Sequence, residues 1–155
     1  MNTATIEVLN DLIHINNDRI AGYQAAINGM DNMDIDLNAL FSNCVNESEE
    51  YREQLVRKIA EYGCKPSDNN TIAGKVYRLW QEFKASFSGN NRHEILESCE
   101  HSEEVMQKAY AFALAESGYI AVDVTQLINE QKRLLKSTYD LIKKYNDVSL
   151  EIKNA

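Results

Sequence analysis

Four glutamates at helical spacing are the residues of this sequence best suited to chemistry. Glu47 and Glu50 lie three residues apart in the stretch "NESEE", and Glu100 and Glu103 have the same spacing further along the chain. Residues three apart share one face of a helix, so each pair can present two carboxylates at one level. Carboxylate oxygens suit hard divalent ions such as Mg²⁺ and Mn²⁺, with iron as a further candidate. The four glutamates are therefore candidate ligands of a divalent metal ion.

The glutamates interrupt apolar helical patterns. Apolar residues recur at alternating spacings of three and four along four segments of the chain, as on one face of a helix. Each segment breaks this pattern once, near its middle, with a polar residue where an apolar one is due. The four interruptions are Asn16, Glu47, Glu103 and Gln131. If the segments pack side by side, these residues form one polar layer across a helical bundle.

Carboxylates inside a bundle are costly unless something compensates their charge. A metal ion, a basic side chain or protonation of a carboxyl group can each do so. Arg19, one turn after Asn16, and Arg52 are the basic residues close enough in sequence to the predicted layer. These three kinds of compensation remain open at the level of the sequence.

The helices that must position the layer are marked by glycines at their expected ends. The glycines are Gly29, Gly63, Gly89 and Gly118, and the predicted helices cover about residues 4–28, 34–62, 91–117 and 121–152. Short connections predict an antiparallel hairpin at each end of the chain. The long connection between the hairpins contains a further amphipathic helix at about residues 71–87. We therefore predict an all-α, ferritin-like four-helix bundle with up-down-down-up topology, formed as a single domain by residues 1–155.

The predicted crossover helix carries an aromatic face formed by Tyr77, Trp80, Phe83 and Phe87. This face can cap the chain's own bundle. Alternatively, it can pair with a second copy of the chain, since exposed apolar patches mark interfaces. The second interpretation predicts a homodimer formed through the crossover helix.

Charge and composition exclude several classes of function. The formal net charge of −8 over 155 residues argues against binding to nucleic acid, whose phosphates must be neutralised by basic residues. No basic segment followed by an apolar run begins the chain, and no apolar run is long enough to span a membrane. Three cysteines without paired spacing indicate reduced thiols. We expect a cytoplasmic protein with no membrane partner.

No arrangement typical of an enzyme is present. The sequence contains no recognisable Ser/His/Asp or Cys/His spacing and no glycine-rich phosphate loop, so no catalytic residue and no organic cofactor is predicted. His101 adjoins Glu100 and is a candidate ligand, although a solvated surface histidine is the favoured interpretation. Whether the protein is an enzyme stays open, and the non-catalytic interpretation is preferred.

Four segments together resemble a bacterial family of ferritin-like four-helix bundles that is catalogued as a domain of unknown function. The segments are "LNDLI", "NNDRIAGY", "AGKVYRLWQEFKASFSG" and "ILESCEHSEEVMQKAYAFALAE". Their order and spacing extend the resemblance over nearly the whole chain. The resemblance implies the ferritin-like fold and assigns no activity.

The polar layer itself resembles the metal layer of the ferritin superfamily, in a degenerate form. The matching positions are Asn16 with Tyr23 seven residues later, Glu47 with Glu50, Glu103, and Gln131. Two departures matter: Asn16 replaces the glutamate of the first helix, and Glu50 stands where the second helix has a histidine. The resemblance therefore implies an all-oxygen site for Mn, Fe or Mg rather than a redox-active di-iron centre.

Two functions follow from these residues. In the first, the protein is a non-catalytic structural or interaction protein whose carboxylate layer is a remnant that fixes the helix register. In the second, Glu47, Glu50, Glu100 and Glu103 hold a divalent metal ion, with a role in metal or stress response. The first is preferred because the superfamily's histidine ligands are missing.

Overall fold

The computed structural model describes residues 3–30, 34–67, 74–84, 89, 91–115 and 119–154. These residues form five α-helices and no strand, which confirms the prediction of an all-α protein. The helices are α1 (Thr3–Gly29), α2 (Ile35–Glu61), α3 (Lys75–Phe83), α4 (Arg92–Ala115) and α5 (Val122–Asn154). None of the described helices combines the length and the apolar character that a membrane crossing requires.

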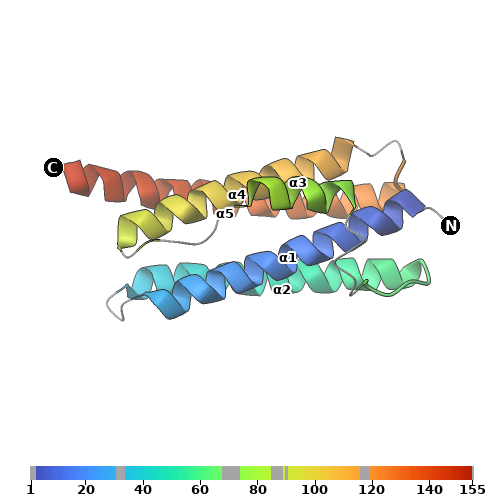
Figure 1. The fold of residues 1–155 in the computed structure, drawn as a ribbon, viewed down its shortest axis with the longest axis horizontal. Coiled ribbons are helices and arrows are strands. Elements are labelled where there is room, and N and C mark those ends of the chain that lie inside the picture. Colours follow the sequence, from blue (N-terminus) through green and yellow to red (C-terminus); the bar gives the residue numbers. More distant parts are fainter. Residues whose placement is uncertain are drawn as a thin grey trace.

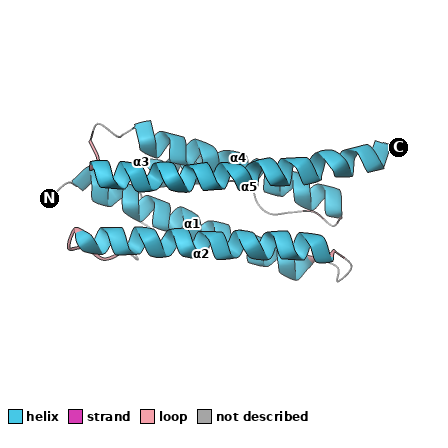
Figure 2. Cartoon of the chain, turned by 180° about the vertical axis from the view of Figure 1, so that it is seen from behind, coloured by secondary structure: helices cyan, strands magenta, loops and turns pink. Residues whose placement is uncertain are grey.

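The long helices pair as two antiparallel hairpins. Helix α1 packs along α2, and α4 packs along α5, while α1 with α4 and α2 with α5 make fewer contacts. Figures 1 and 2 show the two hairpins side by side, with α2 and α4 running in the same direction. The segment that connects α2 to α4 must therefore cross the length of the bundle, and α3 lies within it. The assignment of this bundle to the ferritin-like up-down-down-up fold stays a prediction.

Two of the predicted glycine positions mark helix ends: α1 ends at Gly29 and α2 ends two residues before Gly63. Helix α3, in contrast, ends at Phe83, six residues before Gly89, and is shorter than the predicted helix at about residues 71–87. Gly63 and Gly89 adopt φ angles of 76° and 124°, a region that side-chain-bearing residues rarely occupy. The amide of Gly63 donates to the carbonyl of Ala60 at 2.9 Å and so ends α2. At the start of α4, the amide of Glu94 donates to Oδ1 of Asn91 at 2.9 Å, which is an N-terminal cap. The predicted helix end at Gly118 lies outside the described residues.

Helix α3 is held against α1 by two aspartates. Asp11 accepts hydrogen bonds from the backbone amides of Gly74, at 3.0 Å, and Tyr77, at 3.2 Å, so it caps the free amides at the start of α3. Asp18 accepts from the Tyr77 hydroxyl at 3.0 Å and from Nε1 of Trp80 at 2.9 Å. Burial raises the pKa of Asp11, and the two backbone hydrogen bonds partly oppose this rise.

The aromatic face of α3 is turned toward the chain's own bundle. Val76, Tyr77 and Trp80 are buried, Trp80 with only 3% of its surface exposed, whereas Phe83 is exposed. Phe87, the fourth residue of the predicted face, lies outside the described residues. A side chain that is buried within one chain offers no surface to a second copy. The predicted crossover-helix dimer depended on an exposed aromatic face. Tyr77 and Trp80 do not contribute to such a face, because both are buried.

The close contact at Gly74 gives a test of this docking. A Cβ atom there would overlap Oδ2 of Asp11 and lie 2.5 Å from Cγ of Glu7. We expect Gly74→Ala to lower the free energy of unfolding by about 1–3 kcal/mol, because the buried Asp11 carboxylate would have to move and weaken its hydrogen bonds to the start of α3. Urea unfolding followed by the fluorescence of Trp80, the chain's single tryptophan, measures this loss.

Gly29→Ala is the matched control, since a Cβ at Gly29 meets nothing within 4 Å. It should leave the unfolding midpoint unchanged or slightly higher, because alanine favours the helix more than glycine does. Equal midpoints for the two variants would show that Gly74 is not needed for the docking of α3.

Candidate functional site

A polar level divides the core of the bundle. The buried apolar residues form two separate clusters, and the break between them falls at the same height in all four long helices. The break lies between Ile15 and Ile20 in α1, Val45 and Tyr51 in α2, Cys99 and Val105 in α4, and Leu135 and Ile142 in α5. Polar side chains from the four helices fill this level, and they constitute the candidate site.

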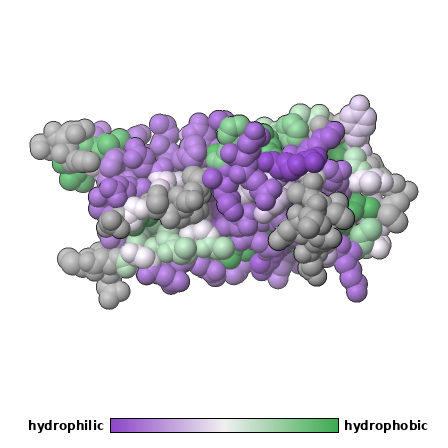
Figure 3. All heavy atoms as spheres, viewed as in Figure 1, coloured by the Kyte–Doolittle hydropathy of each residue, from purple (hydrophilic) through white to green (hydrophobic). Residues whose placement is uncertain are grey.

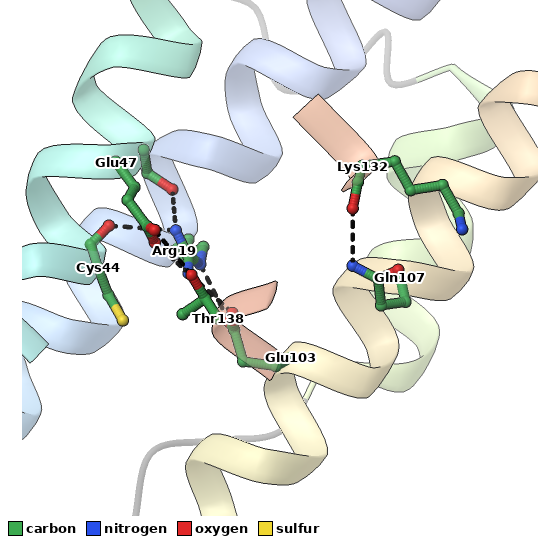
Figure 4. Close-up of polar contacts among 8 residues, drawn as sticks. Arg19, Cys44, Glu47, Glu103, Gln107, Lys132 and Thr138 are labelled. Carbon is green, nitrogen blue, oxygen red and sulfur yellow. Dashed lines mark hydrogen bonds and ion pairs between the residues drawn. The ribbon is translucent and has the colours of Figure 1, made fainter. Parts of the chain in front are cut away.

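The guanidinium group of Arg19 is the centre of the site (Figure 4). Its Nε and Nη2 donate to the two carboxylate oxygens of Glu103 at 3.0 and 2.7 Å, a bidentate ion pair. Its Nη1 donates to Oγ of Ser48 at 2.8 Å and to the carbonyl of Cys44 at 3.1 Å. Its Nη2 also donates to Oε1 of Glu47 at 3.2 Å. Arginine has five N–H donors, so every donor of this side chain has an acceptor.

The two carboxylates differ in their access to solvent. The side chains of Arg19 and Glu103 are 1% and 2% exposed, whereas that of Glu47 is 30% exposed. The hydroxyl of Thr138 donates to Oε2 of Glu47 at 2.7 Å, which brings α5 into the network. The buried Arg19–Glu103 pair is neutral, and the second negative charge lies where water and a hydroxyl can solvate it. We call Arg19, Glu47, Ser48, Glu103 and Thr138 the Arg19 cluster.

The surroundings favour the charged form of Arg19. Burial by itself would lower the pKa of this group, but the adjacent Glu103 carboxylate outweighs burial and the net shift is upward. The guanidinium carbon lies 5.3 Å from the centre of the Tyr23 ring, a cation–π contact. Tyr23, predicted as part of the polar layer, thus contributes its ring face to the site. Burial, together with the charge of Glu103, raises the pKa of its hydroxyl well above the usual value.

Asn16 and Gln131 belong to a second network. The Asn16 amide donates to the hydroxyl of Tyr110 at 3.0 Å, and this hydroxyl donates to Oε1 of Gln131 at 2.7 Å. The Gln131 amide in turn donates to Oε1 of Gln54 at 2.9 Å and to the carbonyl of Tyr51 at 3.2 Å. The prediction of one layer containing Asn16, Glu47, Glu103 and Gln131 is therefore corrected: the residues divide between two networks, each drawing on all four long helices.

The other two predicted metal ligands lie apart from Arg19. The side chain of Glu50 is 55% exposed, 3.9 Å from Arg57. Glu100 accepts a 3.4 Å hydrogen bond from the amide of Asn146, and its other oxygen is buried without a hydrogen-bond partner. Arg52, the second candidate for charge compensation, donates to Oδ1 of Asn17 instead. In the part of the chain that the structure describes, no three His, Cys, Asp or Glu side chains are placed to hold a metal ion.

Sequence reasoning did not identify Ser48, Thr138 or Tyr110. Tyr110 fits the apolar pattern of its helix, and only its buried position beside Asn16 shows that its hydroxyl is used. Ser48 and Thr138 are small polar residues, which occur at many surface positions of helices. The one available signal is that both lie at the height of the interruptions, Ser48 next to Glu47 and Thr138 seven residues after Gln131.

The buried ion pair predicts a large energetic coupling. Arg19→Met leaves the Glu103 carboxylate buried without its partner, and Glu103→Gln leaves the buried Arg19 with only the partly exposed Glu47 as a counter-charge. Each should lower the free energy of unfolding by about 3–5 kcal/mol. The double variant should lose less than the sum, with a coupling of roughly 2 kcal/mol that urea unfolding of the four proteins can measure.

Arg57 and Glu50 form the matched control pair, because their side chains are 66% and 55% exposed. The same cycle with Arg57→Met and Glu50→Gln should give a coupling below about 0.5 kcal/mol. Similar couplings for the two pairs would contradict the special role of Arg19.

No curated protein and no solved structure matches this chain. A family model does match, over residues 4–116, which include nearly all of α1 and the whole of α2, α3 and α4. This match confirms the family-level resemblance identified from the sequence segments. Because it covers well over half of the chain, the chain belongs to the family described as Domain of unknown function (DUF2383).

Proposed function

We propose that this chain is a non-catalytic structural or interaction protein in which the Arg19 cluster fixes the register of the four long helices. The observation that carries the proposal is that all five donors of the buried guanidinium group have acceptors. Displacing α1 or α4 by one turn would separate the buried Arg19–Glu103 pair, at a cost of several kcal/mol. Displacing α2 would remove three acceptors of the guanidinium group, and displacing α5 would remove the Thr138 hydroxyl from Glu47. A network that tolerates a single alignment acts as a register device.

The chemistry of the site supports this interpretation over a metal centre at Glu47 and Glu103. Both carboxylates are bound by the guanidinium group, which lies between them where a shared ion would have to lie. Burial raises the pKa of the Cys44 thiol to about 12, so this neighbouring side chain supplies no thiolate at neutral pH. The oxygen atoms around this position therefore have the Arg19 guanidinium group as their cation.

A divalent metal ion held by Glu47, Glu50, Glu100 and Glu103 is the competing proposal. One observation favours it: Oε1 of Glu100 and Oδ1 of the adjacent Asn146 are both buried without hydrogen-bond partners. Two such oxygens can contribute to the coordination of a hard cation. The single-domain, ferritin-like organisation, the cytoplasmic location and the lack of nucleic-acid binding inferred from the sequence belong to both proposals.

The register function predicts that a variant without the buried charges keeps its stability but loses its single helix alignment. In the triple variant Arg19→Met, Glu47→Gln, Glu103→Leu, the buried charges are removed together. Its free energy of unfolding should equal that of the wild type or exceed it by about 1–4 kcal/mol. Its amide NMR spectrum should contain more resonances than residues, because the helices can then pack in more than one alignment. A single set of sharp resonances would contradict the register function.

The competing proposal predicts a dependence on metal. An ion that binds only the folded state raises the melting temperature as its concentration rises. We expect the wild type, freed of metal with a chelator, to melt within about 2 °C of the same temperature after addition of Mn²⁺ or Fe²⁺, a shift of less than roughly 1 kcal/mol. Calorimetry measures this comparison.

Glu100→Gln and Glu50→Gln serve as the variant and its control in the metal experiment. A rise of several degrees in the wild type that disappears in Glu100→Gln would establish the metal proposal. Its persistence in the exposed variant Glu50→Gln would then exclude Glu50 from the ligand set.

A further inference from the structure

Helix α5 continues past the end of the apolar core. Ile142 is the last of its buried apolar residues, yet the helix extends to Asn154. Figure 1 shows this end of α5 projecting beyond the hairpin formed by α1 and α2. Three large apolar side chains are exposed here: Leu141, Val148 and Ile152, with 43%, 48% and 73% of their surfaces accessible. Figure 3 shows apolar surface at this end of the molecule, beside the atoms drawn in grey.

These side chains form one stripe together with the half-buried Tyr145. The spacings from Leu141 through Tyr145 and Val148 to Ile152 are four, three and four residues, the repeat of a helix that pairs with another helix. We call these four residues the α5 stripe. Ile142 and Asn146, which face the core, lie on a different side of the helix from Val148. Among the described residues, therefore, no helix covers Leu141, Val148 and Ile152.

A groove of about 380 Å³ runs along the stripe. Tyr145, Val148 and Ile152 line one side, and Asp36 and Arg92, at the starts of α2 and α4, line the other. The guanidinium group of Arg92 holds both carboxylate oxygens of Asp36, at 2.9 and 2.6 Å. This polar side of the groove already has its partners within the chain. On the apolar side, Tyr145 packs partly against the core, whereas Val148 and Ile152 stay exposed.

Charges beside the stripe are arranged for self-pairing. Lys144 and Glu151, both exposed, are seven residues apart and therefore lie on the same flank of α5, toward opposite ends of the stripe. No ion pair engages either side chain in the described part of the chain. A surface that meets its own copy across a two-fold axis must be complementary to itself. Opposite charges at the two ends satisfy this condition for an antiparallel copy.

We propose that the α5 stripe is a dimer interface, at which α5 of a second copy of this chain packs antiparallel. In this alignment Leu141 packs against the partner's Ile152, and Tyr145 packs against the partner's Val148. Lys144 then faces the partner's Glu151, and the two-fold axis repeats each contact. The covered surface comes from two short helix ends, so the dimer dissociates readily.

This inference rests on the interaction role proposed above, because it identifies the interaction partner as a second copy of the chain. The two proposals fail separately. A monomeric protein would remove the dimer and leave the register function of the Arg19 cluster untouched. A single alignment of helices in the triple variant would overturn the register function without changing the mass of the wild type.

Sedimentation velocity of the full chain tests the proposal over a range of protein concentrations. The wild type should be a dimer that dissociates on dilution. Val148→Asp should raise the dissociation constant by roughly tenfold or more, because a carboxylate would have to enter an apolar contact. Val122→Asp is the matched control: Val122 is 74% exposed at the opposite end of α5 and should leave the dissociation constant unchanged. A monomeric wild type, or equal dissociation constants for the two variants, would overturn the proposal.

Charge reversal tests the antiparallel alignment. Lys144→Glu and Glu151→Lys should each weaken the dimer by about threefold to tenfold, since like charges then face each other at two sites. The double variant should recover the wild-type dissociation constant. A mixture of the two single variants should form heterodimers in preference to either homodimer. A double variant weaker than both single variants would show that Lys144 and Glu151 do not face each other, and would overturn this alignment.

Discussion

The burial of one guanidinium group is a constraint that the packing of the four long helices has to satisfy. Removing a charge from water costs several kcal/mol even after a protein has relaxed around it, and attraction to a counter-charge offsets this cost only when the geometry is favourable. Arg19 meets that condition, because three acceptor groups on α2 and both oxygens of Glu103 on α4 receive its five donors. One side chain on α1 thus joins three helices, and Thr138 adds α5 through Glu47.

Unequal exposure explains how two carboxylates can serve one arginine. Two fully buried carboxylates would leave a net negative charge in a medium of low polarity. Here Glu103 is the buried partner, and Glu47, with 30% of its side chain exposed, keeps contact with solvent. The apolar residues on either side form two clusters that are each continuous across the bundle. The polar level therefore lies within the core, between two regions that are each stabilised by apolar packing.

The sequence predicts the helices better than their alignment. Periodic apolar residues identify which face of each helix is buried, so the all-α bundle and the inward position of Glu103 follow directly. Periodicity does not fix how far one helix is displaced along another. Asn16 and Gln131 therefore appear equivalent to Glu103 in the sequence but meet at Tyr110 instead. Arg19 is predictable as a charge partner from its spacing, whereas its complete burial is not, because arginine is rarely buried.

The same alignment decides what remains uncovered on α5. Gln131 is tied to Gln54, and Thr138 to Glu47, so α5 has two polar attachments to α2 within its central turns. With its centre fixed in this way, the helix cannot slide to bring Val148 into the core without breaking both attachments. The family match ends at residue 116 and gives no information on this helix. A helix of 33 residues, about 50 Å long, must then extend beyond α4, whose 24 residues span about 36 Å. Under the proposed register function, the polar networks that align the bundle are thus also the reason that apolar side chains reach the surface at its end.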